Sequence, residues 1–222
     1  MTAREPLVAT KLGHSCVRFE RAGVRLVVDP GVLSAPDALD GAAAVLVTHQ
    51  HPDHCDVTRL RQALAADPEL GVWAPADVVA LLAGAGDQVR VVRPGERLGV
   101  AGFDVEVVGE WHALIHPDIP VIANVGFIID GTVLHPGDAL TVPEEDIDTL
   151  LLPVSAPWLK LADVIDYVRA VAPRVALPIH DGVYTAFGLS IVARQLGPDG
   201  VGIGDTTYHA WSDGDSVAID SA

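Results

Sequence analysis

Short apolar segments separated by turn residues dominate the pattern of hydrophobic and polar positions along this chain. Near the N-terminus and in the middle of the chain, these segments predict antiparallel strands, because Gly, Pro and Asp pairs bound them closely. The dipeptide Asp130-Gly131 is a strong signal for a two-residue hairpin. The strands predicted in this way span residues 7–12, 15–21, 24–29, 89–92, 97–100, 103–108, 121–129 and 132–134.

A second pattern alternates apolar strands with helices. The run over 42–47 contains no polar residue, which is typical of a strand buried on both faces of a covered sheet. Strand meanders followed by strand–helix–strand units occur twice. This order predicts an α/β (α+β) fold in which two sheets pack face to face beneath helices, a four-layer αββα sandwich. The other predicted strands span 72–74, 150–153 and 175–179, the helices span 56–66, 75–83, 162–171 and 183–196, and short strands return over 202–219.

Length and composition favour a single domain over residues 1–222. A chain of 222 residues with 50% hydrophobic content can fill one substantial core and is short for two independent ones. The N-terminal sequence lacks the apolar segment of a secretory signal, and no apolar run approaches the ~20 residues that span a bilayer. We therefore expect a cytoplasmic protein that does not enter a membrane, and a homo-oligomer is compatible with these features.

The charge balance bears on the partners of the protein. The chain has 30 acidic and 14 basic residues, a formal net charge of −16. Such a field repels phosphate backbones, and no basic patch interleaved with aromatic residues offsets it. Nucleic acid is therefore not an expected partner, although bound metal ions could still attract a small anion.

Two cysteines, Cys16 and Cys55, form neither a disulfide framework nor a C-x-x-C pair. We expect both to be free thiols. Cys55 directly follows His54, which leaves a functional role open, but a small buried hydrophobe is the commoner role of such a residue.

The densest candidate chemistry directly follows the predicted strand over 42–47. His49 and His51 are two residues apart, so in extended backbone their side chains project to the same side. Pro52 then interrupts the strand and allows the next residues to turn in another direction. One short loop can thus serve two metal ions. Its metal-capable side chains are His49, His51, Asp53 and His54.

A two-metal site needs further ligands from elsewhere in the chain, and we expect them at later strand ends. His112 ends an apolar run, Asp138 comes directly after the predicted hairpin, and His180 closes another strand. Asp29, also at a strand end, is a candidate acceptor for the second ring N–H of a ligating histidine. His135 precedes a proline, and we interpret it as a structural histidine that points away.

The order H-x-H-x-D-H, then a histidine, a Gly-Asp pair and a late histidine resembles that of the metallo-β-lactamase superfamily of metal-dependent hydrolases. The resemblance extends from about residue 13 to residue 180. The segments GHSCV at 13–17 and PIH at 178–180 are similar to the branch that contains ascorbate-phosphate lactonase-type proteins and small uncharacterised hydrolases. In true β-lactamases the position of Asp138 is usually cysteine, so hydrolysis of antibiotics is not predicted.

The resemblance implies a pair of divalent ions. Histidines combined with carboxylates favour Zn²⁺ and permit Mn²⁺ or Fe²⁺. A hydroxide held between the ions would attack a small-molecule ester, lactone or phosphoester, and Asp53 could also accept a proton if it is not tightly coordinated. The implied ligands are His49, His51 and His112 for one ion and Asp53, His54 and His180 for the other, with Asp138 bridging.

Three other functions remain open. The superfamily also hosts iron-dependent oxidoreductases, such as those of the persulfide dioxygenase type, and fold alone does not fix function. A phosphodiesterase or nuclease is disfavoured by the charge balance. A binding protein without catalytic activity is disfavoured by the intact set of ligands.

The sequence leaves the residues that contact substrate less certain. His14 could orient a ligand or touch substrate. His116 competes with His112 as a ligand, and we favour His112 because it ends a strand; His116 then becomes either a substrate-facing residue or a plain solvated one. Trp158 and Tyr184 are candidates for the substrate-binding wall, with core packing the alternative for Trp158. The loops expected to form this wall span 113–120, 139–145 and 156–158.

Overall fold

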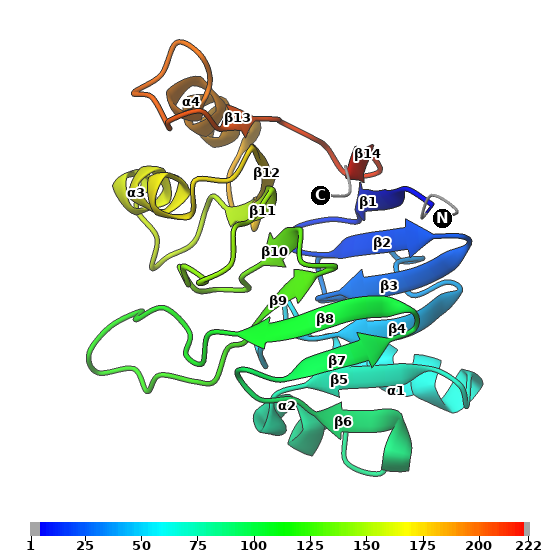
Figure 1. The fold of residues 1–222 in the computed structure, drawn as a ribbon. Coiled ribbons are helices and arrows are strands. Elements are labelled where there is room, and N and C mark those ends of the chain that lie inside the picture. The colour runs from blue at the N-terminus through cyan, green and yellow to red at the C-terminus, as the bar shows by residue number, and fades with distance from the viewer. Residues whose placement is uncertain (1–4, 220–222) are drawn as a thin grey trace.

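The computed structural model describes residues 5–219, and within them two seven-stranded sheets pack face to face (Figure 1). The order of the first sheet is β14-β1-β2-β3-β4-β5-β6 and that of the second is β13-β12-β11-β10-β9-β8-β7. The first sheet consists of β14 (Ser216–Ile219), β1 (Leu7–Lys11), β2 (Val17–Arg21), β3 (Val24–Val28), β4 (Ala42–Leu46), β5 (Gly71–Ala74) and β6 (Val89–Val91). The second consists of β13 (Thr207–Tyr208), β12 (Val175–Ile179), β11 (Thr149–Pro153), β10 (Val133–His135), β9 (Gly126–Ile129), β8 (Phe103–Val108) and β7 (Arg97–Val100).

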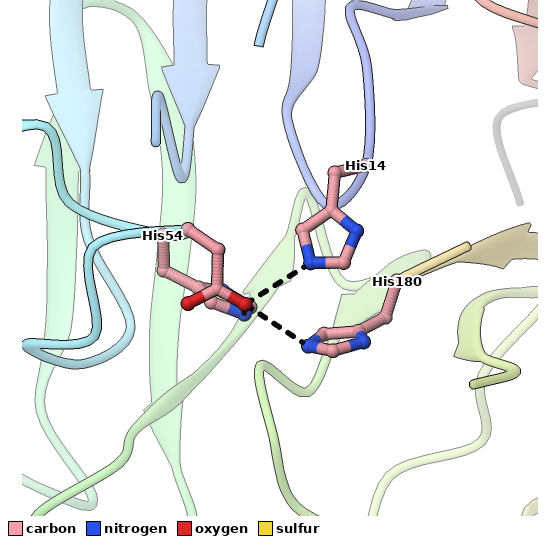
Figure 2. Close-up of side chains that lie close together, drawn as sticks. His14, His54 and His180 are labelled. Atoms are coloured by element: carbon pink, nitrogen blue, oxygen red, sulfur yellow. Dashed lines mark hydrogen bonds and ion pairs between the residues drawn. The ribbon is translucent and has the colours of Figure 1, made fainter. Parts of the chain in front are cut away.

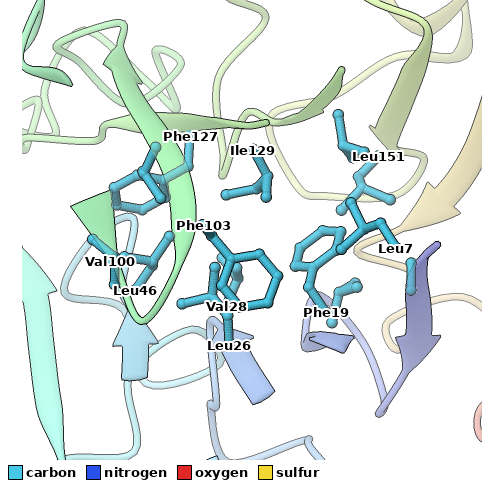
Figure 3. Close-up of a cluster of buried hydrophobic side chains, with 14 of the residues drawn as sticks. Leu7, Phe19, Leu26, Val28, Leu46, Val100, Phe103, Phe127, Ile129 and Leu151 are labelled. Carbon is cyan, nitrogen blue, oxygen red and sulfur yellow. The ribbon is translucent and has the colours of Figure 1, made fainter. Parts of the chain in front are cut away.

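The main core lies between the two sheets, where alternate side chains of facing strands interdigitate. In β8, for example, Val105 and Val107 are buried in this core while Asp104 is exposed, as the two-residue period of a strand requires. Figure 3 shows Phe19 of the first sheet in the same cluster as Phe103 and Phe127 of the second.

Helices form the two outer layers. Helices α1 (Val57–Ala66) and α2 (Ala76–Leu81) cover the first sheet, with η1 (Gly86–Gln88) leading into β6, and α3 (Leu161–Val171) and α4 (Ala186–Leu196) cover the second. Strand β4 lies between the inter-sheet core and α1, which explains its continuous apolar run. No helix within residues 5–219 is long and apolar enough to cross a membrane.

The predicted αββα sandwich is confirmed, but two predicted elements begin three or more residues before the observed ones. The strand predicted over 121–129 is observed only at Gly126–Ile129. Before it, Ala123 forms an isolated antiparallel bridge with Trp111, and the ladder is interrupted where the Val125 N–H donates at 3.0 Å to the carbonyl of Thr48, just after β4 of the other sheet. The helix predicted over 183–196 begins at Ala186, where the Thr185 hydroxyl caps it by accepting from the Gly188 N–H.

Candidate metal centre

The candidate ligands meet at one edge of the sandwich because of the strand directions. In the first sheet β1, β3 and β4 run in the same direction, and in the second β8, β10, β11 and β12 do. The carboxyl ends of these strands therefore open towards a shared rim, where irregular loops present side chains. The loops that follow β1, β4, β8, β10 and β12 carry the residues His14, His49, His51, Asp53, His54, His112, Asp138 and His180.

The first of two clusters brings together His49, His51, His112 and Asp138, whose ligand atoms lie within 4.8 Å of one another. The Nε2 atom of His49 lies 3.1 Å from Nδ1 of His51. The Oδ2 atom of Asp138 lies 3.3 Å from Nε2 of His112 and 3.9 Å from Nε2 of His49. This is the set that the family resemblance implied for one ion, together with the implied bridge.

The second cluster contains His14, Asp53, His54 and His180, again within 4.8 Å. Figure 2 shows the three imidazoles converging from three separate segments. The Oδ2 atom of Asp53 lies 3.6 Å from Nε2 of His180 and 3.9 Å from Nε2 of His54. Asp138 also reaches this cluster, since Oδ1 lies 3.0 Å from Nε2 of His54 and Oδ2 lies 3.2 Å from Nε2 of His180. One carboxylate thus contacts both clusters.

Four buried polar atoms at the centre of the described structure have no hydrogen-bond partner: Nε2 of His54, His112 and His180, and Oδ1 of Asp138. Their separations from one another are short, but none has hydrogen-bonding geometry. A buried polar atom without a partner costs about 1–3 kcal/mol, so four gathered at one point need an explanation. Imidazole nitrogens and carboxylate oxygens are the donor set of Zn²⁺ and related divalent ions. The residues present therefore fit a metal centre.

Hydrogen bonds around the centre orient the histidines. Nδ1 of His112 lies 2.6 Å from the Ala113 carbonyl oxygen, and Nδ1 of His180 lies against the carbonyl oxygen of Ser155. A carbonyl only accepts, so each of these Nδ1 atoms carries the proton and donates it. The lone pair of each Nε2 therefore faces the centre, the form in which a histidine binds a metal.

Asp29 fixes the third of these histidines and is fully buried. Its Oδ2 accepts from Nδ1 of His54 at 2.7 Å and from the Thr48 hydroxyl at 2.7 Å, and its Oδ1 accepts from the Thr48 N–H at 2.7 Å. The predicted role of Asp29 as an acceptor is confirmed. Gly31 allows the loop to pack this closely, since a Cβ there would lie 1.9 Å from the Asp53 carbonyl oxygen.

Asn124 holds the loop that carries Asp138, although no motif or pattern in the sequence points to this residue. Its Oδ1 accepts from the Asp138 N–H and its Nδ2 donates to the Pro136 carbonyl, both at 2.9 Å. The adjacent Gly137 has φ +63°, and a Cβ there would lie 2.4 Å from Asn124 Oδ1. Only glycine fits between the asparagine and the strand end.

His14 contributes to the second cluster in a different way from the ligand histidines. Its Nδ1 accepts from the Gly182 N–H at 3.0 Å, so the neutral ring carries its proton on Nε2. Nε2 lies 3.2 Å from Oδ2 of Asp53 and donates to it. In this arrangement His14 presents a hydrogen-bond donor to a carboxylate at the centre. The sequence suggested that His14 orients a ligand, and its position is consistent with that hypothesis.

The electrostatics of the centre suit a cation. Burial lowers the pKa of His49 well below its usual value, and burial and then His112 lower the pKa of His51. Burial alone would raise the pKa of Asp138, but the neighbouring His54 holds it well below its usual range. Burial also opposes ionisation of Asp53, yet the hydrogen bond from His14 lowers its pKa to about 2. The carboxylates are therefore ionised at neutral pH beside two neutral imidazoles.

The remaining predicted residues lie at different distances from the centre. Trp158 is half-buried, and its Nε1 donates to Oδ2 of Asp138 at 3.3 Å, so it faces the clusters besides packing on the second sheet. Tyr184 is exposed on the segment after His180. The side chain of His116 is exposed, lies in neither cluster and accepts from the Asp118 N–H. Roles of these residues in substrate binding stay predictions.

Two further expectations concern buried groups. His135 is fully buried, donates from Nε2 to the Ser15 carbonyl at 2.9 Å and accepts from the Gly137 N–H at Nδ1, which confirms a structural role. Cys16 and Cys55 are free and buried, as expected.

Comparison of the sequence with known proteins finds a β-lactamase superfamily domain over residues 9–180. Protein Rv0786c of Mycobacterium tuberculosis is 43% identical over 180 residues, which cover 78% of this chain and 84% of that protein. A UPF0173 metal-dependent hydrolase of Carboxydothermus hydrogenoformans is 25% identical over 190 residues, covering 77% of this chain and 83% of that protein.

Solved structures share the fold. Igni18, a metallo hydrolase from Ignicoccus hospitalis, superposes with a TM-score of 0.71 at 18% identity, covering 97% of this chain and 99% of that one. CmlA, a diiron β-hydroxylase from Streptomyces venezuelae, superposes with a TM-score of 0.63 at 16% identity, covering 98% of this chain and 54% of that one. With the family match over most of its length and two His/Asp clusters able to hold metals, this chain belongs to the β-lactamase superfamily and is a metal-dependent hydrolase of the metallo-β-lactamase fold.

Proposed function

We propose that this protein hydrolyses a small ester, lactone or phosphoester at a centre of two divalent ions. The observation that carries the proposal is the carboxylate of Asp138, which lies 3.0 Å from Nε2 of His54 and 3.3 Å from Nε2 of His112 and so contacts both clusters. A single shared carboxylate between two His/Asp clusters is the arrangement expected of a dinuclear site.

The ligands would divide as the two clusters do. When bound, ions of the Zn²⁺ type act as Lewis acids and lower the pKa of a water molecule to about 7. We assign His49, His51 and His112 to one ion and Asp53, His54 and His180 to the other, with Asp138 shared; Zn²⁺ is the favoured metal and Mn²⁺ or Fe²⁺ the alternatives.

The residues of the chain orient the reacting groups. Asp53 is the one carboxylate of the second cluster that solvent reaches, since its side chain is 29% exposed. We propose that it accepts a proton during the reaction, and that His14 acts with it by donating from Nε2 and fixing the position of Oδ2. Trp158, Tyr184 and His116 are the proposed substrate contacts, and Trp158 is held beside Asp138 by its indole N–H.

The test begins with elemental analysis of protein purified without added metal. Activity on a panel of esters, lactones and phosphoesters is then measured before and after chelation and after loading with Zn²⁺, Mn²⁺ or Fe²⁺. His51→Ala and Asp138→Ala should abolish metal-dependent hydrolysis. His209→Ala is a matched control, because His209 is exposed beyond β13 and lies outside both clusters. Full activity in either ligand variant would refute the proposal.

An iron-dependent oxidoreductase is the second candidate. The same nitrogen and oxygen donors accept Fe²⁺, and the fold of CmlA, a diiron β-hydroxylase, superposes on this chain. Iron retained through purification together with O₂ uptake, and no hydrolysis with any metal, would select this alternative.

A further inference from the structure

Most of the large exposed apolar side chains among residues 5–219 lie on the loops that carry the candidate ligands. Single exposed hydrophobic residues are ordinary, but a group around a reactive centre marks a binding surface. Most of these side chains come from three loops: those after β8 and β12, which carry candidate ligands, and the one after β3, which carries Asp29. The loop after β8 projects from the sheets (Figure 1). Examples on these loops are Val32, Leu33, Trp111, Leu114 and Val183. Phe187, which is 75% exposed, lies in the first turn of α4, directly after the loop that follows β12.

Backbone hydrogen bonds join this apolar rim to the metal centre. The Val32 N–H donates to the Pro52 carbonyl at 2.8 Å, inside the ligand loop. Leu114 follows Ala113, whose N–H donates to the Asp138 carbonyl at 2.8 Å. The rim side chains on these two loops therefore start one or two residues from the ligand segments.

The third loop, after β12 of the second sheet, meets the loop after β3 of the first sheet. Gly182, whose N–H donates to His14, lies against Leu33, since a Cβ on this glycine would be 3.4 Å from the leucine Cδ1. Val183 comes next in the chain. The loops after β3 and β12 thus touch each other beside the centre.

Basic side chains are missing from the same segments. Residues 29–35, 48–56, 109–124, 139–147, 154–159 and 180–187 contain no lysine or arginine. Lys11, which reaches this region, is buried against Asp181 and lies 3.4 Å from Asp213, and Arg59 bonds to Ser34 and to the Ala35 carbonyl. Recognition of a carboxylate or phosphate on a substrate usually uses an arginine or lysine.

We infer that the substrate is an uncharged carboxylic ester or lactone with an apolar hydrocarbon chain. The hydrocarbon chain of the substrate lies on the rim while its carbonyl group reaches the metal centre. The inference rests on the proposed function and narrows it by excluding phosphoesters and substrates with an anionic tail. If the hydrocarbon chain of the substrate lay fully on apolar surface, each added methylene would raise the affinity for the substrate about fourfold. For an open rim we expect roughly twofold per methylene.

The first experiment uses the metal-loaded protein and p-nitrophenyl esters from acetate to octanoate, with a carboxylate-tailed ester of matched length. We expect kcat/KM to rise with chain length and the carboxylate-tailed ester to react poorly. Leu114→Ser and Phe187→Ser should lower the ratio of octanoate to acetate activity several-fold. Val201→Ser is the matched control, because Val201 is 54% exposed on the turn after α4, and it should leave that ratio unchanged.

A second readout separates this inference from the proposed function. Alkyl hydroxamates bind metal centres without turnover, so their dissociation constants report the rim directly. Ester hydrolysis with no dependence on chain length, or a preference for the anionic tail, overturns the inference and leaves the hydrolase intact. If no ester is hydrolysed but octanohydroxamate binds much more tightly than acetohydroxamate, the rim is supported as a binding surface and the proposed ester hydrolysis is refuted. If no ester is hydrolysed and the two hydroxamates bind equally, the inference and the proposed function are both overturned.

Sedimentation of the same variants tests whether a second copy of the chain covers the rim instead. A dimer that Leu114→Ser or Phe187→Ser converts to monomer, with chain-length dependence unchanged, would overturn the inference and identify the rim as a self-association surface. A monomer, or a dimer unaffected by either substitution, supports the small-molecule assignment when the chain-length series rises.

Discussion

Asp29→Asn removes the charge of a residue that belongs to neither ligand cluster, and we expect the substitution to weaken metal binding. The carboxylate accepts three hydrogen bonds of 2.7 Å in full burial, two from Thr48 and one from Nδ1 of His54. An amide that kept its oxygen near the Thr48 N–H would turn its NH₂ group towards His54. Two donors then face each other where a donor and an ionised acceptor met.

The loss can be estimated from these contacts. A hydrogen bond to a charged group contributes about 1.5–3 kcal/mol. The Thr48 hydroxyl can rotate and accept from the amide, so about one such bond is lost, and we expect the metal-free protein to lose about 1.5–3 kcal/mol of unfolding free energy. His54 can restore the bond by moving its proton to Nε2, but that step removes the lone pair that faces the centre. Metal affinity should therefore fall by about 10–100-fold.

The assay is competition for Zn²⁺ with a chromophoric chelator, with circular dichroism to verify the fold and urea unfolding to measure stability. Asp56→Asn is the matched control, since Asp56 lies in the loop that carries His54 and caps α1 by accepting from the Arg59 N–H, a role that asparagine fills equally well. A folded Asp29→Asn protein that binds both ions as tightly as the wild type would refute the reasoning.

Three other outcomes follow from the same geometry. Gly137→Ala should lower the free energy of unfolding by at least the 1–3 kcal/mol typical of a left-handed non-glycine residue, and it should also reduce metal binding because the new Cβ meets Asn124. Gly131→Ala is the control, since this glycine has φ +65° and nothing lies within 4 Å of its Cβ position; urea unfolding should show only the backbone cost there. Burial raises the pKa of both thiols, that of Cys55 to about 12, so Cys16 and Cys55 should react with a disulfide reagent at pH 8 far more slowly in the native than in the unfolded protein; equal rates would contradict their burial. Chelation should lower the melting temperature, and added Zn²⁺ should restore it in proportion to the logarithm of its concentration; an unchanged melting temperature would contradict a bound ion.

The fold could be predicted largely because local and tertiary preferences agree in it. The apolar run of β4 faces a core on each side, and Asp130 and Gly131 both have the positive φ that a type I′ hairpin turn requires. The segment over 121–125 shows the opposite case. Its apolar residues predict a strand, yet Ala123 forms only an isolated bridge, with Trp111, and the Val125 N–H donates to Thr48, a residue distant in sequence. No periodicity encodes such a bond.

The candidate ligands could be predicted from sequence because each one ends a strand, and strand ends of one direction share an edge. The residues that orient them are harder to find. Asn124 belongs to no motif, and its function depends on the position of the Gly137–Asp138 turn in space. The tautomer of His14 likewise depends on a donor 168 residues away along the chain, the N–H of Gly182.

The centre also explains an unusual feature of its backbone. His14, Asp29 and His180 all have φ between +51° and +54°, a region that non-glycine residues seldom adopt and that costs on the order of 1–3 kcal/mol each. Each lies where the chain leaves a strand, and the left-handed turn directs its side chain towards the centre. The bonds that hold these side chains, from Gly182 to His14, from Thr48 to Asp29 and from His180 to Ser155, are made between protein groups alone. The two cores on either side of each sheet supply the rigidity that keeps these strained turns in place, so the ligands are held ready for metal by the fold and not gathered by the metal from flexible loops.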